Sequence, residues 1–169
     1  TLGCGTVPSP NPHIILIDGK SGAGKTLLAA RMADALDATL VHLDDAYPGW
    51  GGLAHGRDAV IETALTPLAA GLPGRYRAWD WERDTVGEII EIAPDNVFVV
   101  EGCGVSTPES RELASTVLWV ECDDAVRFAR LGDRDGSKFD EYSEAWDAQV
   151  DAHIAQNNPI GTATIIVRT

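Results

Sequence analysis

Residues 19–26 read Gly-Lys-Ser-Gly-Ala-Gly-Lys-Thr, a complete G-x-x-x-x-G-K-T sequence. A short apolar run at 13–17 precedes it, and a pattern of helical periodicity at 24–36 follows it. In this strand–loop–helix context the glycines let the backbone wind with its N–H groups pointing inward, and the helix adds its positive N-terminal end. The sequence therefore predicts a loop that binds the phosphates of a nucleoside triphosphate.

Each position of this phosphate loop has an expected part in binding ATP and Mg²⁺. Lys25 is expected to reach the β- and γ-phosphates, and the Thr26 hydroxyl is expected to be a Mg²⁺ ligand. The other expected ATP contacts in the loop come from Gly19, Lys20, Ser21, Gly22, Ala23 and Gly24. A guanine-reading N-K-x-D sequence is absent from the chain, which argues against a GTPase.

Further apolar runs indicate the fold class. They occupy residues 39–43, 97–101, 116–120 and 163–167, and helical patterns lie between them at 60–68, 125–131 and 140–156. Strands alternating with helices predict an α/β fold with a parallel sheet covered on both faces. We expect residues 1–12 to form a flexible leader and 13–169 a single domain. Pro67 should kink or shorten its helix. The segment 48–83 shows the least regular pattern.

Composition excludes several classes of partner. The chain of 169 residues has 26 acidic against 13 basic side chains, a formal net charge of −13, which disfavours a broad nucleic-acid or anionic-membrane surface. Its apolar runs are too short to be membrane spans. Three cysteines fit neither a disulfide framework nor a zinc site, so we expect a cytoplasmic protein. We expect it to be a monomer or a homodimer. His42 is expected in a strand core, and His153 in solvent.

Acidic residues follow two of the predicted strands. Because ligands bind at the carboxyl ends of parallel strands, Asp44 and Asp45 should lie near the γ-phosphate. Asp44 could then accept the proton of an acceptor hydroxyl, or orient it, and Asp45 could contact the acceptor. The alternative is that both are solvated turn residues. Glu101 ends another strand and is expected near Mg²⁺.

A basic segment follows the fourth predicted strand, at about 127–140. It contains Arg127, Arg130, Arg134 and Lys138. These side chains could close over the transferring phosphoryl group as a lid. Arg130 would then contact ATP, and Arg134 would lie over the transferring group. The alternative is a solvated helix face with salt bridges to Asp123 and Asp124.

Aromatic side chains gather in the irregular segment. They are Tyr47, Trp50, Tyr76, Trp79 and Trp81, and Arg77 and Asp80 lie among them. Such a group suggests a platform for a planar or sugar-like acceptor, with a small satellite core as the equally weighted alternative.

Five segments in order resemble the uridine kinase-like branch of the phosphate-loop kinases. They are 18–26, 43–50, 76–81, 100–102 and 134–135, and the resemblance extends over most of the chain from His13. It implies a three-layer P-loop NTPase fold, with a five-stranded parallel sheet in the order 2-3-1-4-5 and a helical lid.

The same resemblance implies roles for individual residues. Asp44 matches the catalytic acid, Tyr47 a nearby aromatic, Asp80 a contact to the acceptor sugar and Arg134 the lid arginine. We therefore expect an acceptor site containing Asp45, Tyr47, Arg77, Trp79 and Asp80. Ala46 stands where the family has phenylalanine, and the hairpin that closes over uracil in uridine kinases is hard to locate in the sequence.

Three functions remain open at this point. The first is a Mg·ATP-dependent kinase that phosphorylates a hydroxyl of a small molecule, for example a nucleoside. The second is a nucleoside monophosphate kinase, whose anionic acceptor would need arginines such as Arg75, Arg77 and Arg83. The third is a nucleotide-binding module without productive transfer.

Overall fold

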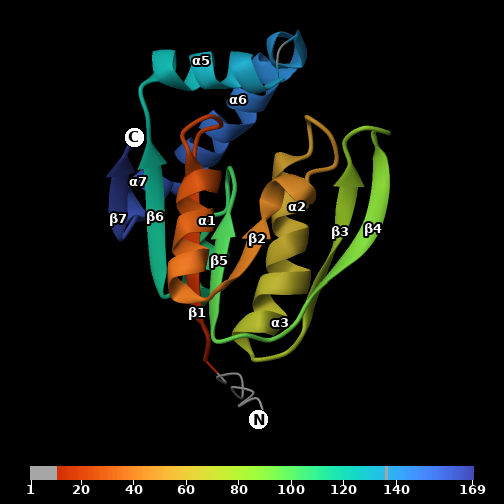
Figure 1. The fold of residues 1–169 in the computed structure, drawn as a ribbon, viewed down its shortest axis with the longest axis vertical. Coiled ribbons are helices and arrows are strands. Elements are labelled where there is room, and N and C mark those ends of the chain that lie inside the picture. The colour runs from red at the N-terminus through yellow and green to blue at the C-terminus, as the bar shows by residue number, and fades with distance from the viewer. Residues whose placement is uncertain (1–10, 136) are drawn as a thin grey trace.

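A computed structural model describes residues 11–135 and 137–169, and the side chains of these residues except 134–140. The predicted leader at 1–12 thus lies almost wholly outside the described residues. Within them the predicted α/β architecture is confirmed (Figure 1).

The central sheet has five parallel strands. They are β1 (His13–Gly19), β2 (Thr39–His42), β5 (Val97–Glu101), β6 (Thr116–Glu121) and β7 (Ile165–Arg168). Their spatial order is β2-β5-β1-β6-β7, with parallel pairing throughout. Numbered as the sequence predicted them, this is the expected order 2-3-1-4-5. All five strands therefore end at the same edge of the sheet.

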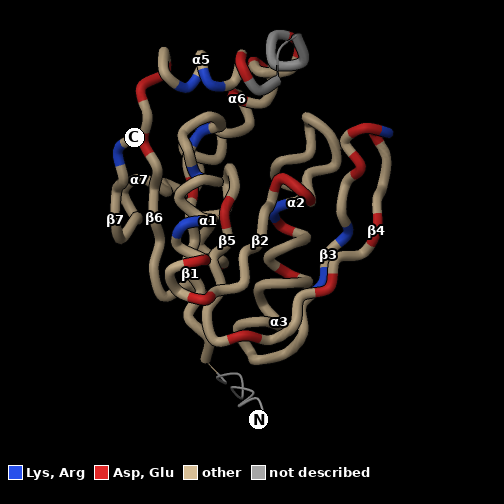
Figure 2. The backbone as a smooth tube through the Cα atoms, in the orientation of Figure 1, with Lys and Arg blue, Asp and Glu red and all other residues tan. Residues whose placement is uncertain are grey.

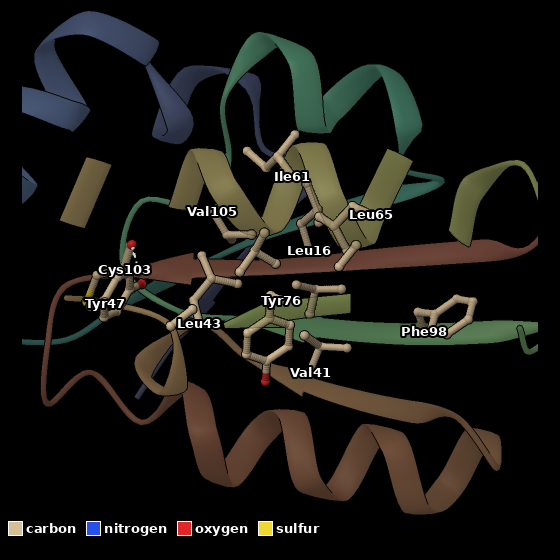
Figure 3. Packing of buried hydrophobic residues seen from close by; sticks show 14 of the residues in the cluster. Leu16, Val41, Leu43, Tyr47, Ile61, Leu65, Tyr76, Phe98, Cys103 and Val105 are labelled. Atoms are coloured by element: carbon tan, nitrogen blue, oxygen red, sulfur yellow. Dashed lines mark hydrogen bonds between the residues drawn. The ribbon is translucent and has the colours of Figure 1, made fainter. Parts of the chain in front are cut away.

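Alternating side chains of β1 pack on opposite faces of the sheet. Ile15 and Ile17 belong to the core beneath α1 (Lys25–Leu36), together with its Ala29. Ile14 and Leu16 belong to the larger core on the other face, which Figure 3 shows in part. Because both faces of β1 are buried, residues 14–17 form a continuous apolar run.

Three helices cover this second face. They are α2 (Leu53–Val60), α3 (Thr66–Ala69) and α6 (Ser137–Asn157). The predicted break at Pro67 takes the form of a π-helical turn at Ile61–Leu65, where the Thr66 N–H donates to the Ile61 carbonyl five residues back. The helix continues through this wider turn into α3, which contains Pro67 and ends at Ala69. Pro67 therefore does not itself end the helix, and the irregularity is the π-helical turn just before it.

An antiparallel hairpin lies beside α2 and α3, beyond the β2 edge of the central sheet (Figure 1). Its strands are β3 (Gly74–Asp80) and β4 (Thr85–Ile92). The segment 48–83, expected to be the least regular, therefore contains α2, α3 and β3. Tyr76 and Ile92 anchor the hairpin in the larger core. Gly74 permits this packing, because a Cβ there would lie 2.7 Å from the Ala64 carbonyl oxygen.

Two helices follow β6 and form the region predicted as a lid. The first, α5 (Asp124–Asp135), passes over the carboxyl ends of the strands, and α6 then descends along the sheet (Figure 1). The short helices α4 (Pro108–Leu113) and α7 (Pro159–Thr162) complete the domain. Among the described residues, none of the helices combines the length and apolarity needed to cross a membrane.

The packing of the π-helical turn predicts the cost of a core truncation. Leu65 has no exposed surface, whereas Leu72 is 58% exposed. We expect Leu65→Ala to lower the free energy of unfolding by about 2–5 kcal/mol, through lost burial and a residual cavity. Leu72→Ala is the matched control and should change it by less than about 0.5 kcal/mol. Urea unfolding of both variants measures the difference, and equal losses would show that this turn does not pack as described.

Candidate active site

A cavity of about 990 Å³ lies at the carboxyl ends of the sheet strands. Six segments line it: the phosphate loop, the residues that follow β2, the tip of the β3–β4 hairpin, the end of β5 with the loop after it, α5 and the first half of α6. The cavity therefore lies where the strand order predicts a ligand site.

The phosphate loop has the backbone conformation that its glycines permit. Gly22 has φ +78° and Gly24 has φ +96°, both in the left-handed region. A Cβ at Gly22 would also lie 2.8 Å from the Arg127 carbonyl oxygen, so α5 packs against the loop at this point. The Ala23 N–H closes the loop by donating to the Lys20 carbonyl, at 3.2 Å.

Lys25 extends its side chain into this loop and is almost fully buried. Its ammonium donates to the Lys20 carbonyl at 3.0 Å and contacts the Cys103 sulfur at 3.4 Å. Burial alone would lower the pKa of Lys25, but nearby Cys103, Asp44 and other acidic groups outweigh it and raise the pKa. Lys25 is thus a positive charge held at the floor of the phosphate loop.

Glu101 joins the end of β5 to the start of α1. Its carboxylate accepts the Thr26 hydroxyl at 3.1 Å and lies 2.7 Å from Nδ1 of His42. The hydrogen bond to Glu101 is the main cause that raises the pKa of His42. His42, expected in a strand core, is instead one-third exposed and holds this buried carboxylate.

The donor set of Thr26 and Glu101 fits Mg²⁺, which prefers oxygen ligands and usually keeps several waters. No cluster of three or more His, Cys, Asp or Glu side chains suited to a metal occurs among the described residues. A metal here would therefore be held by few protein oxygens, with phosphate oxygens and water as its remaining ligands.

Asp18, the penultimate residue of β1, organises the floor of the site. Its carboxylate accepts the N–H groups of Gly19 at 2.7 Å, Gly104 at 2.8 Å and Ser106 at 2.9 Å. The fourth partner is Nε2 of His153, at 2.9 Å. The prediction that His153 is solvated is wrong, because the residue is only 2% exposed and packs behind the phosphate loop. The two partners are separated by 135 positions in the sequence, so the pair leaves no local signal.

Arg127 connects α5, α6 and the phosphate loop. It is buried, donates to Asp124 at 3.0 Å and Asp147 at 3.1 Å, and donates to the Ser21 carbonyl at 2.8 Å. Its guanidinium therefore holds the loop from outside the cavity. Arg127 thus forms salt bridges, as the second interpretation of the basic segment expected, but its side chain is buried and not solvated. Its partners are Asp124 and Asp147, and not Asp123.

The other basic residues of this segment differ in position. Arg130 lines the cavity and donates to the Gly22 carbonyl at 3.2 Å, so it lies beside the phosphate loop as an ATP contact requires. The side chains of Arg134 and Lys138 lie outside the described residues, and the lid role of Arg134 stays a prediction.

The acids after β2 face the cavity from a 3₁₀ turn at Leu43–Asp45. Asp44 and Asp45 are exposed, and the Trp81 indole N–H donates to the Asp44 carbonyl at 2.9 Å. This bond connects the hairpin tip to the turn. The two carboxylates thus share one cavity with Lys25, and their role beside the γ-phosphate stays a prediction.

Aromatic side chains form the half of the cavity away from the phosphate loop. Trp50 stacks on Tyr142, with ring centroids 5.4 Å apart and planes 7° apart, and meets Trp81 and Trp146 edge-on. Tyr47 packs edge-on against Trp146. The Tyr47 hydroxyl donates to the Cys103 carbonyl at 2.7 Å (Figure 3). Tyr142 and Trp146 had no predicted binding role, although they lie four residues apart within the helical pattern predicted at 140–156.

Three residues of the predicted acceptor set line this half: Asp45, Tyr47 and Trp79. Arg77 and Asp80 do not line the cavity. Arg77 donates to the Gly87 carbonyl within the hairpin at 3.4 Å. Asp80 accepts the N–H groups of Glu82 and Arg83, and the hydrogen bond from Arg83 is the main cause that lowers its pKa. Asp80 therefore stabilises the hairpin tip.

Cys103 lies between the two halves of the cavity. Burial is the main cause that raises the pKa of its thiol to about 11, and Lys25 opposes this shift only in part. A thiol with this pKa stays protonated at neutral pH, which makes it a poor nucleophile.

Comparison with known proteins finds kinases among the similar sequences and structures. No family profile matches the sequence. The cytidylate kinase of Erwinia tasmaniensis is 34% identical over 121 residues, which cover 70% of this chain and 48% of that protein. The chain thus spans about half the length of this curated relative.

Solved structures share the fold. A "Possible Uridine Kinase" from Bacillus stearothermophilus superposes with a TM-score of 0.67 at 20% identity, over 96% of this chain and 91% of that one. Shikimate kinase from Bacteroides thetaiotaomicron does so with a TM-score of 0.51 at 18% identity, over 91% and 85%. The fold implied by the resemblance to uridine kinase-like proteins is therefore confirmed.

The Asp18 network predicts a large effect of a small substitution. Asp18→Asn replaces one acceptor oxygen by an NH₂ group, so two of the four partners lose their acceptor, either Gly19 and Gly104 or Ser106 and His153. We expect it to lower the free energy of unfolding by about 3 kcal/mol. Asp151→Asn, the control, removes an exposed salt bridge to Lys20 and should cost less than about 1 kcal/mol. If thermal unfolding shows equal losses, Asp18 is not the anchor described here.

The raised pKa of His42 predicts how stability depends on pH. A folded pKa above the unfolded value of 6.5 means that His42 contributes its full stability below that pH. The contribution is lost as the pH rises through the raised folded pKa. The destabilisation by His42→Gln should therefore be larger at about pH 5.5 than at about pH 9 in urea unfolding. A difference that stays constant with pH would contradict the pairing with Glu101.

Proposed function

We propose that the protein is a cytoplasmic, Mg·ATP-dependent kinase that transfers the γ-phosphoryl group of ATP to a hydroxyl of a small molecule. One observation carries this proposal. A single cavity contains the phosphate loop with Lys25 in one half, and Asp44 with the aromatic side chains in the other. Donor and acceptor would then meet between a cation and a carboxylate, which is the arrangement that phosphoryl transfer needs.

The phosphate half supplies binding and charge stabilisation. Lys25 and the loop N–H groups would hold the phosphates, and Arg130 lies beside the same loop. Mg²⁺, when bound, would neutralise negative charge on the phosphates, and Thr26 and Glu101 are the residues that would hold it. Because Lys25 keeps its charge, it can stabilise the negative charge that develops as the bond to ADP breaks.

Asp44 supplies the carboxylate on the acceptor side. Its side chain would accept the proton of the acceptor hydroxyl while the hydroxyl oxygen forms a bond to the γ-phosphorus and the bond to ADP breaks. Such proton transfer contributes about 10²–10⁴ in rate. Arg134 is the residue proposed to close over the transfer.

A nucleoside is the acceptor suggested by the uridine kinase-like fold. The aromatic rings near Trp50 would suit a planar base. Asp45, Tyr47 and Trp79 lie in reach of such an acceptor because they line the cavity. Arg77 and Asp80 would act indirectly, through the shape of the hairpin.

A nucleoside monophosphate kinase is the second candidate. The 34% identity to a cytidylate kinase favours it. The positions of the expected arginines do not, because Arg75, Arg77 and Arg83 are absent from the described lining of the cavity. A phosphate acceptor also needs no carboxylate base, so the two candidates differ in their dependence on Asp44.

Two substitutions test the division of labour in the cavity. Lys25→Ala should abolish transfer, because it removes the charge that holds the terminal phosphates. Asp44→Asn should leave the affinity for ATP within about twofold of wild type and lower kcat by about 10²–10⁴. Calorimetric titration with ATP and a coupled ADP-release assay measure the two quantities.

The acceptor panel for this assay includes nucleosides, nucleoside monophosphates, sugars and small hydroxy acids. Near-normal turnover by Asp44→Asn would show that Asp44 is not the base, and with a monophosphate acceptor would favour the second candidate. ATP binding without transfer to any acceptor would contradict both kinase functions and leave a nucleotide-binding module.

A further inference from the structure

His42 and Glu101 are register partners in the central sheet. The strands β2 and β5 pair in parallel with His42 opposite Glu101, and each of these residues ends its strand. Their neighbours Val41 and Val100 belong to the larger core, so alternation along the strands puts His42 and Glu101 on the other face, which α1 covers. The sheet itself therefore brings the imidazole to the carboxylate, at the edge where the cavity lies.

The hydrogen bonds to the Glu101 carboxylate end on one of its two oxygens. Nδ1 of His42 lies 2.7 Å from Oε1, and the Thr26 hydroxyl donates to the same oxygen at 3.1 Å. Both bonds that the described residues give to this carboxylate thus end on Oε1. Because Glu101 lines the cavity although it is only 2% exposed, Oε2 is the oxygen left for a ligand there.

This carboxylate lies where acidic residues end two neighbouring strands (Figure 2). Asp44 and Asp45 lie in the turn that follows β2. Like charges repel, so the orientation of the Glu101 carboxylate depends on the donors that hold it. Rotation about the last torsion of a glutamate is broad, and packing alone does not decide which oxygen faces the cavity. The two donors on Oε1 make that choice.

The two donors differ in their relation to the metal site. Thr26 is itself a residue proposed to hold Mg²⁺. His42 is absent from the described lining of the cavity, and its side chain is one-third exposed. Its contact with the site is through Glu101. A residue that touches a metal ligand and not the metal is the usual means by which proteins orient such a ligand.

Building on the proposed function, we infer that His42 is a positioning residue for the Mg²⁺ of Mg·ATP. Its imidazole N–H holds Oε1 of Glu101, which keeps Oε2 for the metal or for a water bound to it. Residues that orient metal ligands in this way contribute about 10–100-fold to metal affinity. His42 therefore sets how much Mg²⁺ the enzyme needs, and it leaves the binding of metal-free nucleotide unchanged.

Nucleotide binding tests this inference without any acceptor. Calorimetric titration measures the affinity for a nonhydrolysable ATP analogue in EDTA and over a series of Mg²⁺ concentrations. His42→Val removes the donor and places a residue suited to a strand. We expect it to raise the Mg²⁺ concentration that gives half of the gain in affinity by about 10–100-fold, with the affinity in EDTA within about twofold of wild type. Electron paramagnetic resonance with Mn²⁺ in place of Mg²⁺ should show the same loss for the ion itself.

A rescue variant and a control distinguish positioning from damage to the fold. The amide nitrogen of His42→Asn is attached to Cγ, as Nδ1 is, so this variant should keep the Mg²⁺ requirement within about threefold of wild type. His55→Gln changes an exposed histidine of α2 outside the described lining and should alter neither quantity. If His42→Val does not fold, His42→Gln takes its place with the same expected loss, because its amide lies one carbon further from the backbone.

A double substitution tests whether His42 acts through Glu101. In a Glu101→Gln background, His42→Val should change the Mg²⁺ requirement by less than about twofold, because the charged group that it orients is gone. A full additional loss in that background would overturn the inference. So would a wild-type requirement in His42→Val, an equal loss of affinity in EDTA, or a failure of His42→Asn to restore the requirement.

The same titrations separate this inference from the proposed function. Wild-type nucleotide binding that does not depend on Mg²⁺ would contradict the Mg·ATP site and the role of His42 together. Wild-type binding that depends on Mg²⁺, with unchanged His42 variants, would overturn the role of His42 and leave the kinase. Failure to phosphorylate any acceptor would overturn the kinase, whereas the titrations would still decide the role of His42.

Discussion

The carboxylate of Asp18 is the interaction on which the rest of the site depends. It lies at the end of the central strand β1 and accepts hydrogen bonds from Gly104, Ser106 and His153, besides its own neighbour. A buried carboxylate is stable only when its oxygens are satisfied in this way. One side chain therefore ties together the start of the phosphate loop, the loop after β5 and the helix α6.

Asp18 holds two segments, the loop after β5 and the helix α6, and each of them positions further residues of the cavity. The loop after β5 carries Cys103, whose sulfur contacts Lys25 and whose carbonyl accepts the Tyr47 hydroxyl. The position of Lys25 is thus linked to Tyr47, an aromatic side chain of the other half of the cavity. Gly102 permits this approach, because a Cβ there would lie 2.5 Å from the Cβ of Leu43.

The helix α6 fixes the second side of the cavity. Its Asp147 holds Arg127, which in turn holds the Ser21 carbonyl of the phosphate loop. Two residues later, Gln149 donates to the Trp50 carbonyl at 2.7 Å and accepts the first N–H of α2 at 3.3 Å. Because one helix contacts both halves of the cavity, a displacement of α6 would change the distance between donor and acceptor.

The features that could be predicted from the sequence are those encoded in short, continuous segments. The phosphate loop, the five apolar strands and the acids at strand ends are encoded in short segments, and strand alternation with helices fixed the sheet class. The hairpin was missed because β4 carries exposed Val86 and Ile89 and lacks a clean apolar face. The Asp18–His153 pair joins residues remote in sequence, and each alone resembles an ordinary polar residue. The role of Arg127 depended on Asp147 of another helix, which no spacing in the sequence indicates.

The central claim is that one cavity places the terminal phosphate of ATP between Lys25 and Asp44. A crystal structure with Mg²⁺ and a nonhydrolysable ATP analogue tests it most directly. The account predicts phosphates wrapped by residues 19–26, with the terminal phosphate directed towards Asp44 and the aromatic half. A terminal phosphate directed away from Asp44, or a nucleotide bound outside this loop, would contradict it.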